Sequence, residues 1–479
     1  MFVIQLKKYS PGLIIALLIS CTLSAQQAAV PAPPADTSNI PVAVKYIIGE
    51  IRVAGNLKTR RSIILREIPV HTGDAYSLQD LVKKFEDARR QLMNTTLFYS
   101  VVVAAGEFKG NVIDIMVNVK ERWYLFPLPY LKPVDRNLNQ WLVQQHASLS
   151  RVNYGAKLLY NNASGHNDKL RLWLITGYTR QISASYDRLY IDKGMKWGLK
   201  FALSAGKNRE LNYNTINDKQ VFLKDYSGYV RNFINTQVEL TYRRAIKTRH
   251  SIGIGFSSEE VEDTIVKLNP AYFKSGRHRI RFPEISYNMT YFDVDYIPYP
   301  TQGYAANINL SKKGINASNN LWQLQLKGMG SWHLSPKTFM NVIAFGGIKL
   351  PFKQPYFNLR FLGYGDVFMQ GYEYYVVDGV AGGYLKTTLT RELLNFGIRL
   401  PRKGKESLQL PIRIFGKIYG NSGYVHNPQP GENSLSNRML HSAGIGIDIL
   451  TFYDVIFRFE YSFNQLGQNG LYLHRKTIF

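Results

Sequence analysis

The sequence predicts a mostly β protein: a transmembrane antiparallel β-barrel of about 16 strands, preceded by one small α/β domain. Three observations lead to this prediction. Roughly 350 residues after Trp123 show no helical period but many alternating segments of about ten residues, the length of a tilted membrane-spanning strand. The 32 Tyr, 25 Phe and 38 Gly suit strands, tight turns and interfacial girdles. The N-terminus has the pattern of a secretory signal.

Residues 1–25 have the parts of a signal peptide: Lys7-Lys8, an apolar run Leu13–Ile19, and a cleavage site after Ala25. The apolar run is too short to span a membrane, which needs about 20 residues. The alternative is a cytosolic protein with an apolar N-terminal helix. Residues 26–44, rich in Ala and Pro, predict a tether.

The single cysteine, Cys21, excludes an intrachain disulfide. It lies at the end of Leu18-Ile19-Ser20-Cys21, which resembles a bacterial lipoprotein box. Two fates are therefore open for Cys21. It is discarded by cleavage after Ala25, or it is lipidated.

Residues 45–121 predict a small domain with the order β-α-α-β-β. Thr59 is expected to cap a short helix, and Ser77 with Asp80 is expected to begin a longer one that ends near Leu92. The domain contains no cluster of His, Cys or carboxylate residues that indicates catalysis. An exposed strand edge that binds an extended peptide and a rigid spacer are both compatible with this pattern.

Residues 122–479 predict the barrel, and the segment DVIFRFEYSFN is its strongest strand. A soluble sandwich is the alternative, in which the apolar faces meet a second sheet. The secretory signal, the number of segments and the many aromatic residues favour the barrel. The apolar face of this segment consists of Val455, Phe457, Phe459, Tyr461 and Phe463, and the polar face of Arg458, Glu460, Ser462 and Asn464.

The formal net charge of +25 arises from 59 Lys and Arg against 34 Asp and Glu. Such an excess is typical of proteins that bind nucleic acid or an anionic membrane surface. Polar strand faces offer another place for basic residues, which could line a lumen or reach lipid phosphates; the rest lie on solvated loops. We therefore expect no nucleic acid partner. The basic residues on predicted polar faces are Lys196, Lys200, Arg413, Lys417 and Arg458.

Several motifs resemble those of the BamA/TamA-type outer-membrane family, the bacterial surface antigen family. Ile51–Asn56, Ile64–Glu67 and Val117–Glu121 resemble its periplasmic POTRA domain, which the family usually has in tandem and which occurs once here. In the barrel, Asp295–Pro300 before Gly303-Tyr304 resembles its hairpin signature. Two further motifs resemble the family's late strand and its terminal aromatic residue: Leu389–Leu393 and Phe479. The order of all these motifs along the chain is specific to the family.

The segment Met369-Gln370-Gly371-Tyr372-Glu373 resembles the tip of the family's lumen loop. In the family an arginine precedes the glycine and pairs with an aspartate on a lumen-facing strand. Here the arginine is replaced by Gln370, and the matching strand has Asn421, two residues before Gly423, in place of the aspartate.

Because replacing one partner alone would leave a buried charge unpaired, the double change leads to the hypothesis that Gln370 hydrogen-bonds Asn421. Gly371 is expected to let the backbone approach the barrel wall, and Tyr372 to pack there. The alternative is an ordinary aromatic loop.

The resemblance implies a bacterial outer-membrane protein with its POTRA domain in the periplasm, which assists insertion or translocation of polypeptides without ATP. It implies a seam between the first and last strands, near Ser150–Tyr160 and Gly470–Phe479, with Tyr472 at the seam and Phe479 as the terminal signal. The implied partners are unfolded outer-membrane or secreted polypeptides, the bilayer with lipopolysaccharide-type headgroups, and a periplasmic partner at the POTRA domain.

Two other functions remain open: a dedicated passive secretion channel or pore, and a surface-structural or adhesive barrel. An enzyme is not expected. The sequence contains no nucleophile elbow, zinc-protease motif or phosphate-binding loop, and no cofactor or metal is predicted.

Overall fold

The computed structural model describes residues 44–134, 140–225, 227–316, 319–400 and 408–474. The predicted signal peptide with Cys21, the predicted tether up to residue 43 and the terminal Phe479 lie outside the described residues. The described chain contains a small α/β domain and a 16-stranded antiparallel sheet, so the predicted fold class and strand number are confirmed.

The α/β domain has a four-stranded sheet in the order β2-β1-β4-β3, in which β1 and β4 are parallel and β3 and β4 antiparallel. The predicted order lacked β2, because a strand of three residues is too short for alternation to reveal it. The elements are β1 (Lys45–Ala54), α2 (Arg61–Arg66), β2 (Ala75–Ser77), α3 (Leu78–Asn94), β3 (Phe98–Lys109) and β4 (Val112–Glu121).

The two helices of this domain begin differently. The Ser77 side chain accepts a hydrogen bond from the backbone N–H of Asp80 at 3.2 Å, so α3 has the predicted cap. The predicted Thr59 cap of α2 is wrong: this helix follows Arg60 with no side-chain cap. Thr59 is buried instead, and its hydroxyl lies 3.0 Å from the Tyr124 hydroxyl, which offers a partner that the sequence pattern cannot reveal.

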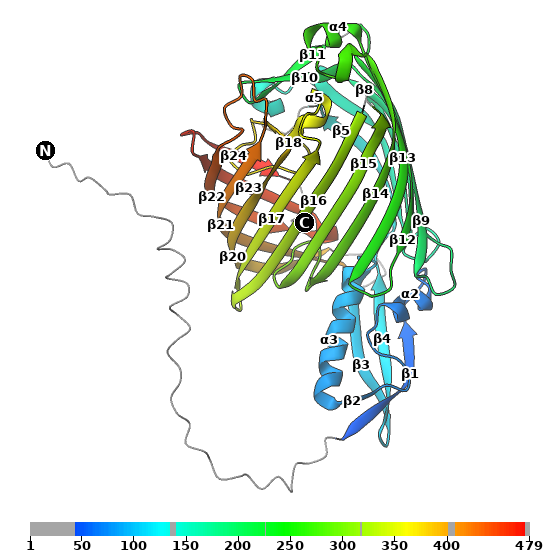
Figure 1. Ribbon diagram of the computed structural model, residues 1–479. Helices are drawn as coiled ribbons and strands as arrows, with labels where there is room; N and C mark the ends of the chain where they lie inside the picture. The colour runs from blue at the N-terminus through cyan, green and yellow to red at the C-terminus, as the bar shows by residue number, and fades with distance from the viewer. Residues whose placement is uncertain (1–43, 135–139, 226, 317–318, 401–407, 475–479) are drawn as a thin grey trace, which may run out of the picture. The chain divides into compact units, whose positions relative to one another are not determined.

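The large sheet consists of neighbouring antiparallel strands in chain order, and Figure 1 shows β13 to β17 as long tilted strands side by side. Its strands are β5 (Leu125–Pro133), β6 (Val152–Asn161), β7 (Lys169–Gly177), β8 (Thr179–Tyr190), β9 (Trp197–Asn208), β12 (Arg231–Tyr242), β13 (Thr248–Val261), β14 (Arg279–Val294), β15 (Gly303–Asn316), β16 (Asn319–Ser335), β17 (Thr338–Leu350), β20 (Ala381–Leu400), β21 (Leu408–His426), β22 (Met439–Leu450), β23 (Ile456–Asn464) and β24 (Asn469–His474).

Smaller elements lie in the connections between these strands. No helix in the described ranges is both long and apolar enough to cross a membrane. The smaller elements are η3 (Gln140–Gln144), η4 (Leu149–Arg151), β10 (Glu210–Ile216), β11 (Lys219–Lys224), α4 (Asp263–Leu268), η5 (Lys274–Gly276), α5 (Tyr356–Leu359), β18 (Arg360–Leu362), β19 (Val377–Asp378) and η6 (Phe452–Asp454).

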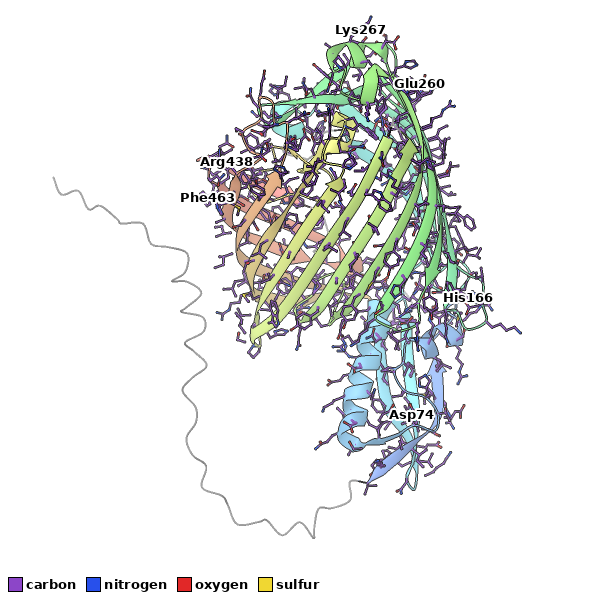
Figure 2. All side chains as sticks on the ribbon, in the orientation of Figure 1. Asp74, His166, Glu260, Lys267, Arg438 and Phe463 are labelled. Atoms are coloured by element: carbon purple, nitrogen blue, oxygen red, sulfur yellow. The ribbon has the colours of Figure 1, made fainter. Side chains whose placement is uncertain are left out.

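The barrel strands expose their apolar faces and enclose their polar faces. Ile254 is 64% exposed, and Phe463, which Figure 2 labels on the outer side of the barrel, is 49% exposed. The neighbouring inner positions line a cavity of about 670 Å³, to which Asn235 and Gln237 contribute. This inverted polarity is what lipid outside and a wet lumen inside require, and it rules out the soluble sandwich.

Adjacent residues of β12 allow a direct test of this polarity. Val238 lies on the exposed apolar face and Gln237 lines the lumen cavity. We expect Val238→Lys to lower the free energy of unfolding in phosphatidylcholine vesicles by about 2–4 kcal/mol, because it places a charge in hydrocarbon. Gln237→Lys should have a small effect. Urea titration followed by tryptophan fluorescence measures both, and equal effects would contradict the assigned faces.

Candidate functional site

The loop of residues 351–380, between β17 and β20, packs against the inner face of the barrel wall. Its side chains form one hydrophobic cluster with side chains of the wall and of the β21–β22 connection, so it is held by packing as well as by polar contacts. The buried members of this cluster are Phe361, Leu362, Met369, Tyr372 and Val377 from the loop, with Tyr384, Val425, Leu435 and Leu440.

The glycine of the loop tip lies where the backbone comes closest to the wall. Gly371 has φ +86°, and a Cβ there would lie 3.0 Å from the Cβ of Ser442 on β22. Its carbonyl accepts a hydrogen bond from Asn464 Nδ2 at 2.7 Å. Other residues are disfavoured at Gly371 by both the backbone conformation and the lack of space.

The residues on either side of Gln370-Gly371 are also buried against the wall. The Tyr372 hydroxyl donates to the His441 carbonyl at 3.1 Å. A Cβ at Gly423 would lie 3.1 Å from Met369 Sδ, so the structure brings these two predicted residues together.

The hypothesis that Gln370 pairs with Asn421 is wrong. Gln370 Nε2 donates to Glu460 Oε1 on β23 at 3.3 Å, and Asn421 Nδ2 donates to Ser442 Oγ on β22 at 3.0 Å. The amide of Gln370 reaches a carboxylate, which is a stronger acceptor than a second amide. The amide of Asn421 is used across the strands of the wall itself.

A buried charge network lies beneath the loop tip. Lys417 Nζ on β21 lies 2.5 Å from Asp448 Oδ1 and 2.7 Å from Glu460 Oε1. The Tyr299 hydroxyl donates to Asp448 Oδ2 at 3.0 Å, and Arg458 Nε lies 3.8 Å from the same oxygen. The side chain of Glu460 is only 1% exposed, so its charge depends on these neighbours.

The same network joins the loop tip to the last strand. His474 on β24 lies between two carboxyl groups: its Nδ1 is 2.6 Å from Glu460 Oε2, and its Nε2 is 3.6 Å from Glu373 Oε1 of the tip. The rings of Tyr374 and the predicted seam residue Tyr472 are 5.8 Å apart. The tip therefore contacts strands that lie at one end of the sheet.

The carboxyl group of Glu373 belongs to the loop, outside the membrane-spanning strands. Burial is the main cause that raises its pKa to about 8, and the negative charge of Glu460 acts in the same direction. At neutral pH this carboxyl therefore holds a proton.

The predicted position of the first seam strand is wrong. Ser150–Tyr160 overlaps β6, which pairs with β5 on one side and β7 on the other. The sheet begins one strand earlier, at β5, whose three prolines conceal its strand character. Within the described ranges, no ladder joins β5 to β24.

Three residues of the site were not predicted from the sequence: Glu460, His474 and Asp448. A signal existed for Glu460 and Arg458, because the alternation of residues 455–464 placed both on the polar face of a predicted strand. Lys417 was predicted on a polar face and lies in the network. No group of three or more His, Cys, Asp or Glu side chains suited to a metal ion occurs in the described part of the chain.

Comparison with known families gives two matches. Residues 46–122 match the surface antigen variable number repeat of the POTRA type, and residues 162–464 match the Omp85 superfamily domain. The second match covers more than half of the chain. The protein belongs to the Omp85 superfamily.

Individual relatives of this Omp85 protein are distant. It is 32% identical over 78 residues to the outer membrane protein assembly factor BamA of Neorickettsia risticii (strain Illinois), and this match covers 16% of the chain and a tenth of that relative's length. Among solved structures, CdiB from Escherichia coli has a TM-score of 0.52 at 11% identity. This match covers 90% of this chain and 75% of the CdiB chain.

BamA from Haemophilus ducreyi lacking POTRA domains 1–3 has a TM-score of 0.48 at 15% identity. This match covers 90% of this chain and 83% of that BamA chain. The CdiB structure shares the fold of this Omp85 protein. The family matches make the protein an outer-membrane protein with a periplasmic POTRA domain.

The charge network predicts a large effect of removing its cation. Lys417→Met should lower the free energy of unfolding by about 3–5 kcal/mol, because Asp448 and Glu460 lose their ammonium partner in a buried site. Urea titration in vesicles measures this loss. The triple variant Lys417→Met, Asp448→Asn, Glu460→Gln should regain part of it, and a triple variant no more stable than the single one would contradict the electrostatic explanation.

The protonated Glu373 predicts a pH dependence of stability. Between about pH 4.5 and 8 the folded protein holds a proton that the unfolded chain releases, so the free energy of unfolding falls as the pH rises through this window. Glu373→Gln should remove this contribution. The free energy of unfolding of the variant should therefore rise relative to that of the wild type from pH 5 to pH 8. The exposed Glu432→Gln is the control, and a constant difference between Glu373→Gln and wild type would refute the assignment.

Proposed function

We propose that this Omp85 protein assists the insertion or translocation of outer-membrane or secreted polypeptides at the outer membrane, without ATP. The observation that carries the proposal is the seam: the loop tip contacts β24 from inside, while no described ladder joins β24 to β5. Unpaired strand edges are costly in lipid, and a client strand that pairs with an edge removes that cost. The BamA relative is named an outer membrane protein assembly factor, which supports the same assignment.

The POTRA domain would receive the client on the periplasmic side. Its sheet ends in β3, a strand of 12 residues on which Val102 is 53% exposed and Phe108 57% exposed. An extended polypeptide can add to such an edge by backbone hydrogen bonding, and its side chains can contact the apolar residues. A periplasmic partner protein is the other occupant that this edge would suit.

The domain boundaries form part of the proposal. The signal peptide (residues 1–25) would direct the chain across the inner membrane, the tether (26–44) would precede the POTRA domain (45–121), and the barrel (122–479) would lie in the outer membrane. The basic excess of the chain would favour contact with lipopolysaccharide-type headgroups. The loop tip Met369–Glu373, with Asn421, Gly423 and Tyr472, would form the internal site that holds the end of the sheet.

A dedicated channel is the second candidate, and the lumen cavity of about 670 Å³ favours it. Conductance across planar bilayers separates the two functions. A stable open pore in the purified protein would support the channel.

Depletion of the protein in its native cells, followed by quantitative proteomics of the outer membrane, tests the main proposal. We expect the levels of many unrelated β-barrels or surface lipoproteins to fall together, because a general assembly factor serves many clients. Re-expression of wild type should restore them, and Lys417→Met should restore them less well at equal protein level. If one protein or none falls, the general assembly function is refuted.

A further inference from the structure

The outer face of β8, β9, β12, β13 and β14 carries a row of polar and basic residues beside a row of mostly apolar ones. The pairing registers place these residues side by side from strand to strand. Ile182 is 60% exposed and Ile234 is 48% exposed, so both rows belong to the lipid-facing side of the sheet. The polar row consists of Arg180, Lys207, Asn232, Glu260 and Arg279, and the apolar row of Ile182, Ala205, Ile234, Ser258 and Arg281.

The polar row lies at the extracellular ends of these strands. The connections beside it are long: residues 209–230 contain β10 and β11, and residues 262–278 contain α4 and η5. The connections at the opposite ends, residues 191–196 and 243–247, are short. Outer-membrane barrels have short periplasmic turns and longer extracellular loops. Figure 2 labels Glu260 of the polar row and Lys267 of α4 at the same end of the barrel. The polar row therefore lies at the level of the outer headgroups, with the apolar row next to it on the acyl-chain side.

All ten residues of the two rows line one groove of about 870 Å³. Its apolar part alternates small and large side chains: Ala156 is paired with Leu174, and Ala205 with Ile182. The small residues leave space between the large ones, and the groove is therefore shaped for a slender apolar group such as an acyl chain.

The groove carries a net positive charge. Four of its lining residues are cations, Arg180, Lys207, Arg279 and Arg281, and one is an anion, Glu260, which gives a formal charge of +3 (four less one). Arg279 Nη2 lies 2.6 Å from Glu260 Oε2, so the carboxylate is already used by one cation. Arg and Lys side chains bind phosphate through charge-assisted hydrogen bonds, and clustered cations beside a bilayer are typical of anionic headgroup sites.

Three cations surround one aromatic ring at the β8–β9 end of the groove. Arg180 Cζ, Lys207 Nζ and Arg209 Cζ lie 5.6, 5.9 and 5.6 Å from the centre of the Tyr229 ring. Cation–π attraction holds these long side chains near each other despite their like charges. An anion bound among them would relieve that repulsion.

Two buried polar atoms of the groove also point to a ligand. Among the described residues, neither the Tyr229 hydroxyl nor Asn232 Oδ1 has a hydrogen-bond partner. Both residues line the groove. A phosphate oxygen can accept from the Tyr229 hydroxyl, and a sugar hydroxyl can donate to Asn232 Oδ1, after a shift of the flexible basic side chains.

We propose that this groove binds one phosphorylated glycolipid of the lipopolysaccharide type. One phosphate is bound by Arg180 and Lys207, a second by Arg279 and Arg281 across the groove, and an acyl chain lies along the apolar row. Two separate groups of cations suit a headgroup with two phosphates better than one with a single phosphate. The inference rests on the proposed function for the contact with lipopolysaccharide-type headgroups, and not for the assembly of polypeptides.

Native mass spectrometry of the full chain in detergent micelles tests the proposal. The probes are bisphosphorylated lipid A and phosphatidylglycerol, each titrated separately. We expect one lipid A to bind per chain, with an affinity at least tenfold higher than that of phosphatidylglycerol, and millimolar inorganic phosphate should not displace it. Absence of bound lipid A, equal affinity for the two lipids, or displacement by free phosphate would overturn the proposal.

Charge removal inside and outside the groove locates the site. The double variant Arg180→Gln, Lys207→Gln should weaken lipid A binding at least tenfold. The control Lys267→Gln, Arg277→Gln removes the same charge from exposed residues that do not line the groove, and its affinity should stay within twofold of wild type. Equal losses in both variants, or no loss in the first, would refute the site.

Heat-dependent gel mobility confirms that each barrel is folded. If the Arg180→Gln, Lys207→Gln variant does not fold, Arg281→Gln replaces it, with an expected loss of at least threefold.

The lipid experiment is separable from the assembly function. If lipid A binds in the groove but depletion leaves the outer-membrane proteome unchanged, the assembly function fails and the lipid site stands. If depletion lowers the levels of many barrels but lipid A does not bind, the lipid site fails and the assembly function stands.

Discussion

Hydrocarbon offers no hydrogen-bond partner, so each membrane-spanning strand must satisfy its backbone within the protein, and the architecture follows from this constraint. The strands are long and their registers mostly unbroken, as between β12 and β13. Among the described strands of the large sheet, β5 and β24 each have a neighbouring strand on one side and none on the other. These ends differ in composition: β5 has three prolines, which lack a backbone N–H, whereas β24 has none.

The lumen reverses the chemistry of a soluble core. Apolar residues cover the outside, and charged groups are buried inside, where each depends on its neighbours. The family pattern places a cation on the loop and its partner on the wall, but here Lys417 carries the positive charge from the wall strand β21. The loop contributes an amide at Gln370 and a protonated carboxyl at Glu373 instead, so the tip approaches the wall without bringing a charge of its own.

The sequence was sufficient for the fold class, the strand number and the cap of α3, because each depends on local pattern. Alternation in residues 455–464 assigned the two faces of β23 correctly. The predicted partner of Gln370 was wrong, because the partner depends on which strand the loop tip crosses. No local sequence pattern contains that information. The first barrel strand was missed for the opposite reason: the prolines of β5 disguise a strand that tertiary pairing with β6 enforces.

The contacts of the loop tip also determine the order in which the molecule can become native. Gln370 and Glu460 are 90 residues apart in the chain, and Asp218 accepts hydrogen bonds from the backbone of Ser434 and Leu435, 216 and 217 residues further on. Such distant contacts are slow to form, because the intervening chain must be ordered first. The loop is synthesised before the strands that hold it, so its docking must wait for β22 to β24. We therefore expect the interior to be the last region to fold.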